Sequence, residues 1–269
     1  MTRLLHWSDL HTEFRNFELP DIPDDIDALL LGGDTGVGRG HLGFLEEAWD
    51  KYRIPIVSIW GNHELYQTSF KNLRSYEKTK LAQLREGGAD IRVLHAETTK
   101  IKDTTIFGAT MWTDFELYPA QEVTSKRTAR HRMRDFHAIW SDTAYGPITP
   151  DDVQKIHWDE RQKLRKALSS ERNGPMIVMT HHVPHEAAVS RRYRGDPLTP
   201  AFCSNMIDEI EMGPDFWIFG HTHDGVEVDI PTDRGLTRLR HNPRGYPDEG
   251  SPFDPFRIID TESPEKGSI

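Results

Sequence analysis

Aspartate, asparagine and histidine residues recur directly after short apolar runs of this sequence. LLHW is followed by Ser8-Asp9-Leu10-His11, ALLL by Gly32-Gly33-Asp34, and IPIVSIW by Gly61-Asn62-His63-Glu64. MIVM is followed by Thr180-His181-His182, and FWIF by Gly220-His221-Thr222-His223. Each motif alone is weak, because such short combinations commonly form turns. Their joint occurrence after five apolar runs indicates one shared chemical site.

The side chains in these motifs offer oxygen and nitrogen ligands and no thiolate. Two aspartates, one asparagine amide oxygen and four histidines suit Mn²⁺, Fe or Zn²⁺, and are too rich in nitrogen for Ca²⁺ or Mg²⁺ alone. Seven ligands exceed what one ion takes from protein when it must keep positions open for substrate. They fit two ions about 3.5–4 Å apart, bridged by a carboxylate and a hydroxide.

The apolar runs that precede the motifs are continuous rather than alternating, which predicts strands covered on both faces. We expect strands at 3–7, 28–31, 54–60, 105–109, 176–179 and 216–219, and helices at 42–52, 70–87, 149–170 and 201–211. This alternation favours an α/β domain. Because ligands of open α/β sheets bind outside the carboxyl ends of the strands, the five motifs are expected to converge on one crevice.

Composition places few limits on function. The 269 residues carry a formal charge of −10, which disfavours broad binding to nucleic acid. The single cysteine, Cys203, indicates a reducing environment, and neither a signal peptide nor a membrane span is visible. We therefore expect a cytoplasmic protein of one domain over 1–269, with a lid-like insertion at about 112–150, where aromatic, arginine and histidine residues interrupt the alternation.

In their order along the chain, Asp-x-His, Gly-Asp, Gly-Asn-His-Glu, a histidine at a strand end and Gly-His-x-His resemble the calcineurin-like metallophosphoesterases. The resemblance runs from Leu4 to His223. It implies a four-layer α/β/β/α sandwich with two central mixed sheets. The segment RHNPRGYP, Arg240 to Pro247, is similar to a feature of a bacterial branch whose substrates are poorly defined.

The resemblance also implies roles for individual residues. Asp9, His11 and His223 would hold one metal, Asp34 would bridge to a second, and Asn62, His181 and His221 would complete that second site. The doubled histidine leaves His181 and His182 as alternatives, and the family's ligand, which directly follows the strand and a small residue, favours His181. Besides Asp34, His63 would act in catalysis without binding metal.

The implied reaction is hydrolysis of a P–O bond by a hydroxide bridging the two metals, with His63 protonating the leaving alkoxide. We expect a phosphodiesterase or nucleotide pyrophosphatase acting on a small phosphorylated substrate. The alternatives are a nuclease of the same superfamily, which the acidic charge disfavours, and a phosphomonoesterase. A non-enzymatic scaffold is disfavoured, because scaffolds of this fold lose ligands and here every ligand position is filled.

Two basic stretches add candidates for substrate binding. On one helix, Arg127, Arg130 and Arg134 would share a face and hold substrate phosphates. The alternative is a solvated helix face paired with Glu122 and Asp135. The stretch 191–194 follows the His181 loop and is a second candidate, although charged runs are usually only solvated.

Overall fold

The computed structural model of the chain describes residues 1–143 and 145–262, so the expected domain and insertion each include residues outside the described part. Two mixed sheets form its centre. The first has the order β11-β1-β2-β3-β4, with β1 (Arg3–Trp7), β2 (Ala28–Leu31), β3 (Ile56–Ile59) and β4 (Ile91–Leu94) parallel and β11 (Ile258–Asp260) antiparallel to β1.

The second sheet has the order β5-β6-β7-β8-β10-β9. Its four inner strands are parallel and its two edge strands are antiparallel. The inner strands are β6 (Thr104–Ala109), β7 (Met176–Thr180), β8 (Phe216–Phe219) and β10 (Gly235–His241), and the edges are β5 (Glu97–Ile101) and β9 (Val228–Thr232).

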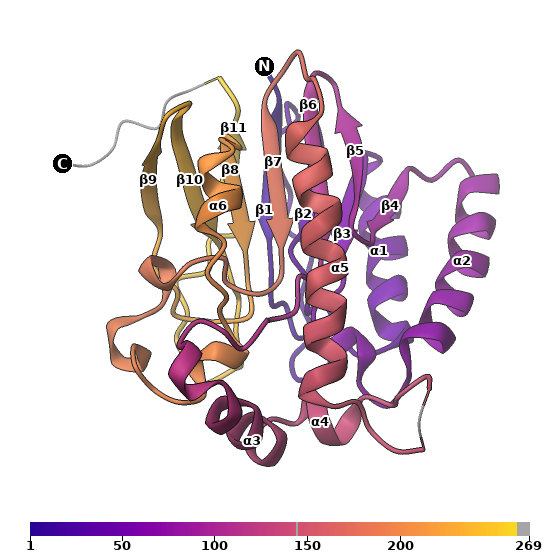
Figure 1. Cartoon of the computed structure of the whole chain (residues 1–269). Helices are drawn as coiled ribbons and strands as arrows, with labels where there is room; N and C mark the ends of the chain where they lie inside the picture. The colour runs from indigo at the N-terminus through magenta and orange to yellow at the C-terminus, as the bar shows by residue number, and fades with distance from the viewer. Residues whose placement is uncertain (144, 263–269) are drawn as a thin grey trace.

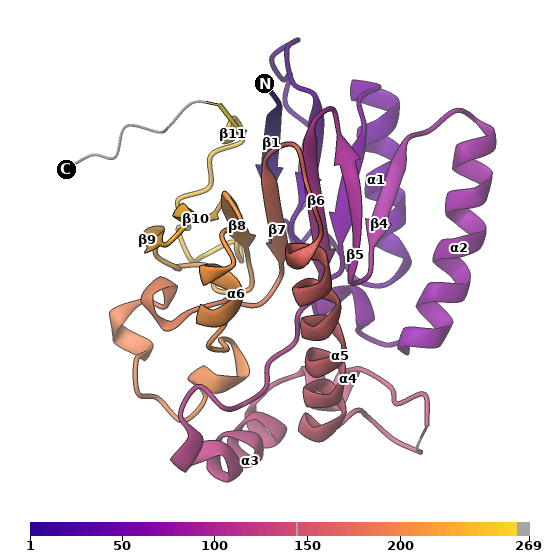
Figure 2. The ribbon, with the colours of Figure 1, turned by 45° about the horizontal axis from the view of Figure 1, so that its top comes forward.

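Helices cover the outer face of each sheet (Figures 1 and 2). The first sheet is covered by α1 (Arg39–Tyr52) and α2 (Phe70–Glu86), and the second by α5 (Pro150–Ser169) and α6 (Ile207–Glu211). At the end of the molecule toward which β7 and β8 point lie α3 (Glu122–Arg132) and α4 (Asp135–Ala138). Short 3₁₀ turns complete the chain: η1 (His63–Leu65), η2 (Pro119–Gln121), η3 (Glu186–Ala188), η4 (Arg191–Tyr193) and η5 (Thr199–Ala201).

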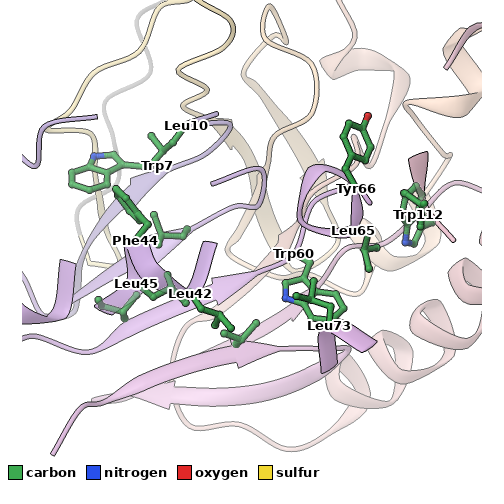
Figure 3. Packing of buried hydrophobic residues seen from close by; sticks show 14 of the residues in the cluster. Trp7, Leu10, Leu42, Phe44, Leu45, Trp60, Leu65, Tyr66, Leu73 and Trp112 are labelled. Atoms are coloured by element: carbon green, nitrogen blue, oxygen red, sulfur yellow. The ribbon is translucent and has the colours of Figure 1, made fainter. Parts of the chain in front are cut away.

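Three apolar clusters hold these layers together. One, including Leu4, Val57 and Ile177, lies between the two sheets. A second packs α1 and α2 on the first sheet and includes Trp7, Leu42 and Trp60 (Figure 3). The third packs α5 and α6 on the second sheet. The continuous apolar runs are thus buried on both faces, as expected, and the result is a four-layer α/β/β/α sandwich.

The six expected strands are present, and three of the four expected helices match α1, α2 and α5 closely. The helix expected at 201–211 is wrong over its first half. Only Thr199–Ala201 forms a 3₁₀ turn, and α6 begins at Ile207. Between them, the Ser204 hydroxyl accepts the Asp114 N–H at 3.1 Å, and Ser204 N–H donates to the carbonyl of Val183 at 3.2 Å. These non-helical hydrogen bonds compete with the helix.

Among the described residues, no helix is both long enough and apolar enough to cross a membrane.

Candidate metal centre

The candidate ligands leave their strands through unusual backbone turns. Asp9, His11 and Asp34 have φ angles of 51°, 46° and 52°, and His221 has a φ of 66°. Side-chain-bearing residues rarely adopt this left-handed region, and such strain concentrates at functional sites. Hydrogen bonds hold these turns in place. His11 N–H donates to the Asp34 carbonyl at 2.9 Å, and His221 N–H donates to Asp9 Oδ1 at 2.8 Å.

Asp9, His11 and His223 form a first group, whose ligand atoms lie within 4.8 Å of one another. The Nε2 atoms of His11 and His223 are 3.1 Å apart, and His223 Nε2 is 3.5 Å from Asp9 Oδ1. Two imidazole nitrogens and a carboxylate oxygen therefore face one point. That arrangement suits a cation of the transition series.

Asp34, His181 and His221 form a second group within the same 4.8 Å limit. The amide oxygen of Asn62 joins it, 3.1 Å from His181 Nε2. Asp34 Oδ2 lies 3.4 Å from His181 Nε2 and 3.9 Å from His11 Nε2, so this carboxylate lies between the two groups. The other oxygen, Oδ1, accepts the backbone N–H of His63 at 2.8 Å, which fixes the carboxylate in this orientation.

Several polar atoms of the two groups lack protein partners. Among the described residues, the buried Oδ2 of Asp9 and Nε2 of His221 have no hydrogen-bond partner. Buried polar atoms are normally paired, so each such atom needs an explanation. The backbone also passes close to the two carboxylates at Gly61 and Gly220. A Cβ at Gly61 would lie 2.2 Å from Asp34 Oδ1, and one at Gly220 would lie 2.5 Å from Asp9 Oδ2. The donor set and its orphaned atoms fit divalent cations.

The charges of the cluster are strongly coupled. Burial opposes the charged forms, yet the Asp34 carboxylate raises the pKa of His181 to about 10, and Asp9 raises the pKa of His223 to about 9. Burial would raise the pKa of Asp34, but the cationic His181 and His63 hold it well below its usual range. Without a cation, protons therefore balance the carboxylates. Metal binding must release these protons, so it weakens as pH falls.

The doubled histidine is divided between two environments. His181 Nε2 lies in the second group, whereas the His182 ring packs on His221 with centroids 4.3 Å apart. Its Nδ1 lies 3.3 Å from the Thr110 carbonyl, and burial and the cationic His181 lower the pKa of His182 to about 3. His181 therefore lies among the other candidate ligands, whereas the His182 ring packs against His221.

His63 lies beside both groups, with its two ring nitrogens facing different partners. Nδ1 is 2.7 Å from Glu13 Oε1, and Nε2 is 3.1 Å from the Tyr246 hydroxyl and 4.0 Å from Asp34 Oδ2. Burial disfavours the imidazolium, but Asp34 and Glu13 outweigh it and raise the pKa of His63. Glu13 therefore orients the ring and supports its protonated form.

Sequence analysis did not assign a role to Glu64, which is fully buried. Its carboxylate accepts the backbone N–H groups of Gly61 at 2.7 Å, Asp34 at 3.0 Å and Thr35 at 2.8 Å. These bonds tie the turn after β2 to the turn after β3. Glu64 is therefore a positioning residue, and its place directly after His63 was the signal that could have found it.

The segment RHNPRGYP also reaches this site. The Arg244 guanidinium donates to the carbonyls of Leu10, Arg15 and Asn16, at 2.9, 2.9 and 2.7 Å, which fixes the segment on the turn after β1. Tyr246 then packs over His11, with ring centroids 4.5 Å apart. Two residues beyond RHNPRGYP, Glu249 contacts Nδ1 of His223. Neither contact could be read from the motif, because both depend on where the chain returns after β10.

A cavity of about 660 Å³ opens beside the cluster. Its lining includes Asp34, Asn62, His63, His221 and His223 together with Tyr246. Two further segments contribute to the lining. The first is 132–135, between α3 and α4, and the second is the η4–η5 stretch, including Arg192 and Tyr193.

The expectation that Arg127, Arg130 and Arg134 share one helix face is wrong for Arg134. α3 ends at Arg132, so Arg134 does not continue the face of Arg127 and Arg130. The lining of the cavity includes Arg132 and Arg134 but neither of the other two. Glu122, expected as a possible partner of this face, forms an ion pair with Lys126 at 2.7 Å, and Lys126 also pairs with Asp151 at 2.9 Å.

The model of one family, calcineurin-like phosphoesterase, matches residues 2–225. The chain belongs to the calcineurin-like phosphoesterases. A member of this family is a hydrolase of phosphoester bonds, and the family uses divalent metals, for which the His/Asp groups described above are suited. The match ends before RHNPRGYP, so Tyr246 and Glu249 lie beyond the family model.

One solved structure superposes well enough to show the same fold. Phosphopantetheinyl hydrolase (PptH) from Mycobacterium tuberculosis superposes with a TM-score of 0.70 at 15% identity, over 98% of this chain and 97% of that one. A dimetal phosphatase from Danio rerio has a TM-score of 0.49 at 12% identity, over 90% of this chain and 87% of that one. None of the curated proteins compared with the chain is significantly similar to it.

Proposed function

We propose that this phosphoesterase is a phosphodiesterase or nucleotide pyrophosphatase that acts on a small substrate. The observation that carries the proposal is the cavity of about 660 Å³ that joins the metal-ligand cluster to His63. Pockets for small ligands range from about 300 to about 1,000 Å³. A recess of this size suits a nucleotide-sized substrate better than a duplex or a folded phosphoprotein.

In this proposal the two ligand groups hold two ions, drawn from manganese, iron or zinc. Asp9, His11 and His223 would hold the first, Asn62, His181 and His221 would hold the second, and Asp34 would serve both. Bound ions supply Lewis-acid activation of the phosphoryl group and of the attacking water.

His63 acts as the general acid. Its Nδ1 is engaged by Glu13, so the proton it delivers to the leaving oxygen comes from Nε2, the nitrogen near Tyr246 and Asp34. The raised pKa of His63, caused by Asp34 and Glu13 against the effect of burial, favours the protonated ring that a general acid requires. The Tyr246 hydroxyl lies where it can contact the group that His63 protonates.

Hydrolysis of two chromogenic substrates tests the proposal. Protein reconstituted with Mn²⁺ is expected to hydrolyse bis-p-nitrophenyl phosphate with a higher kcat/KM than p-nitrophenyl phosphate. Activity on the monoester alone would replace the diesterase assignment with a phosphomonoesterase. Hydrolysis of neither ester, nor of dinucleotides and nucleotide sugars, would contradict the proposed function.

A further inference from the structure

Two arginines flank the turn between α3 and α4 and line the same cavity as the ligand cluster. Arg132 is the last residue of α3, Arg134 directly precedes α4, and both side chains are exposed. Met133 between them is 8% exposed and packs in the apolar cluster of the first sheet. The buried methionine therefore anchors the turn and directs its two neighbours away from the core.

Neither guanidinium is neutralised within the part of the chain that the structure describes, because no carboxylate there forms an ion pair with Arg132 or Arg134. Arg192 lines the same cavity but is paired with Asp224 at 2.6 Å.

The acids of the lining are engaged elsewhere. Asp196 accepts the Leu198 N–H at 2.7 Å, Glu249 contacts His223, and Asp135 is buried with its Oδ2 3.4 Å from the Tyr66 hydroxyl. Two unpaired cations thus face the cavity of a protein with a net charge of −10.

The position of Arg134 relative to the reacting groups follows from ring contacts. Its Cζ lies 5.6 Å from the centroid of the Tyr66 ring, and that ring lies 4.3 Å from the His63 ring. Arg134 Cζ is therefore within about 10 Å of the His63 ring. Since His63 would protonate the leaving oxygen, Arg134 lies within reach of the leaving portion of a bound substrate, and Arg132 lines the same cavity.

We infer that Arg132 and Arg134 form a second anion-binding site, which takes a phosphate carried by the leaving portion of the substrate. The inference rests on the proposed function and narrows its substrate class to esters or anhydrides whose leaving group is itself phosphorylated. Guanidinium groups bind phosphate oxygens through paired, charge-assisted hydrogen bonds, and a fixed pair of them gives both affinity and orientation.

Calorimetric titration of the Mn²⁺-reconstituted protein with non-chromogenic ligands tests this site. Ethane-, butane- and hexanediol bisphosphates are compared with butyl phosphate, which has only one anionic end. We expect at least one bisphosphate to bind about tenfold more tightly than butyl phosphate, because its second phosphate gains charge-assisted hydrogen bonds from the guanidinium groups. In the double variant R132M/R134M this advantage is expected to fall below about threefold, because both guanidinium groups are gone.

The matched control is R127M/R130M, which removes the same charge from α3 at two exposed positions outside the cavity lining. It is expected to keep the full advantage of the bisphosphate. Equal losses in both double variants would show only a net-charge effect and would overturn the inference, as would equal affinities of all bisphosphates and butyl phosphate for the wild type. Failure of the proposed function has a separate signature, the absence of hydrolysis by the wild-type protein whatever its ligand affinities.

Discussion

His63 is held at both ring nitrogens by side chains far away in sequence. Glu13, fifty residues earlier, contacts Nδ1, and Tyr246, 183 residues later, contacts Nε2. The family motif indicates which histidine faces the substrate, but not these two partners. Spacing in sequence carries no information about contacts of such range, so Glu13 and Tyr246 became identifiable only from the fold.

Replacing His63 separates protonation from metal binding. We expect His63→Ala to lower kcat for bis-p-nitrophenyl phosphate by about 10²–10⁴-fold, the usual contribution of a general acid. The metal content of the variant should equal that of the wild type, because none of the proposed ligands is removed. Parallel measurement of kcat and of bound manganese checks this, with His137→Ala on α4 as an exposed control. Loss of metal together with activity, or survival of activity, would contradict the role of His63.

The Tyr246 hydroxyl offers a second residue-level test. Tyr246→Phe keeps the ring that packs on His11 and removes only the hydroxyl 3.1 Å from His63 Nε2. We expect kcat/KM to fall about tenfold, the equivalent of one hydrogen bond to the reacting group, with an unchanged Tm. Tyr193→Phe in the same cavity is the control. If both phenylalanine variants behaved like the wild type, the hydroxyl would have no part in the reaction.

At the scale of elements, six parallel strands were predictable, and the inner strand β10 and the edge strands were not. The six predicted strands are largely apolar runs, whereas β10 has the mixed sequence GLTRLRH, β5 is mostly exposed, and β9 is an edge strand interrupted by Pro231. Such segments lack the pattern that marks a buried strand, because solvent covers one of their faces. The start of helix α5 could be predicted from the sequence, because Thr149 and Asp152 form a capping box around a first-turn proline.

Helix α5 also carries a carboxyl group that makes stability depend on pH. Burial raises the pKa of Glu160 to about 8, from the usual value of about 4.3 for a glutamate, although the backbone N–H groups of Met111 and Trp112 oppose the shift. Between these values the folded state holds a proton that the unfolded state has lost, so the free energy of unfolding falls as pH rises.

Glu160→Gln removes this titration. Relative to the wild type, the variant should gain stability as pH is raised from about 5 to about 8, as measured by urea denaturation at each pH. Comparing the two proteins at each pH cancels the pH dependence of metal binding. A difference in unfolding free energy that stays constant over this range would contradict the raised pKa.

At the scale of the whole molecule, the site exists because two sheets end at the same place. Asp9, Asp34 and Asn62 follow strands of the first sheet, and His181 and His221 follow strands of the second. The sequence predicted that these groups converge at strand ends, since parallel strands present their carboxyl ends together. The expected lid at about 112–150 and the stretch 191–194 gave candidates for the wall formed by α3, α4 and the η4–η5 segment. Which of their residues line the cavity could not be read from segments without a clear period.

The proposed function requires that these side chains form one dinuclear centre bridged by Asp34. The most direct test is the metal-to-protein ratio after reconstitution with Mn²⁺ and removal of free ions, measured by elemental analysis. We expect about two ions per chain in the wild type, and about one or fewer in Asp34→Asn, because the bridging carboxylate serves both groups. Asp196→Asn, which changes a cavity acid outside the cluster, should retain about two. A wild-type ratio of one or less in an active protein, or an unchanged ratio in Asp34→Asn, would contradict the dinuclear centre.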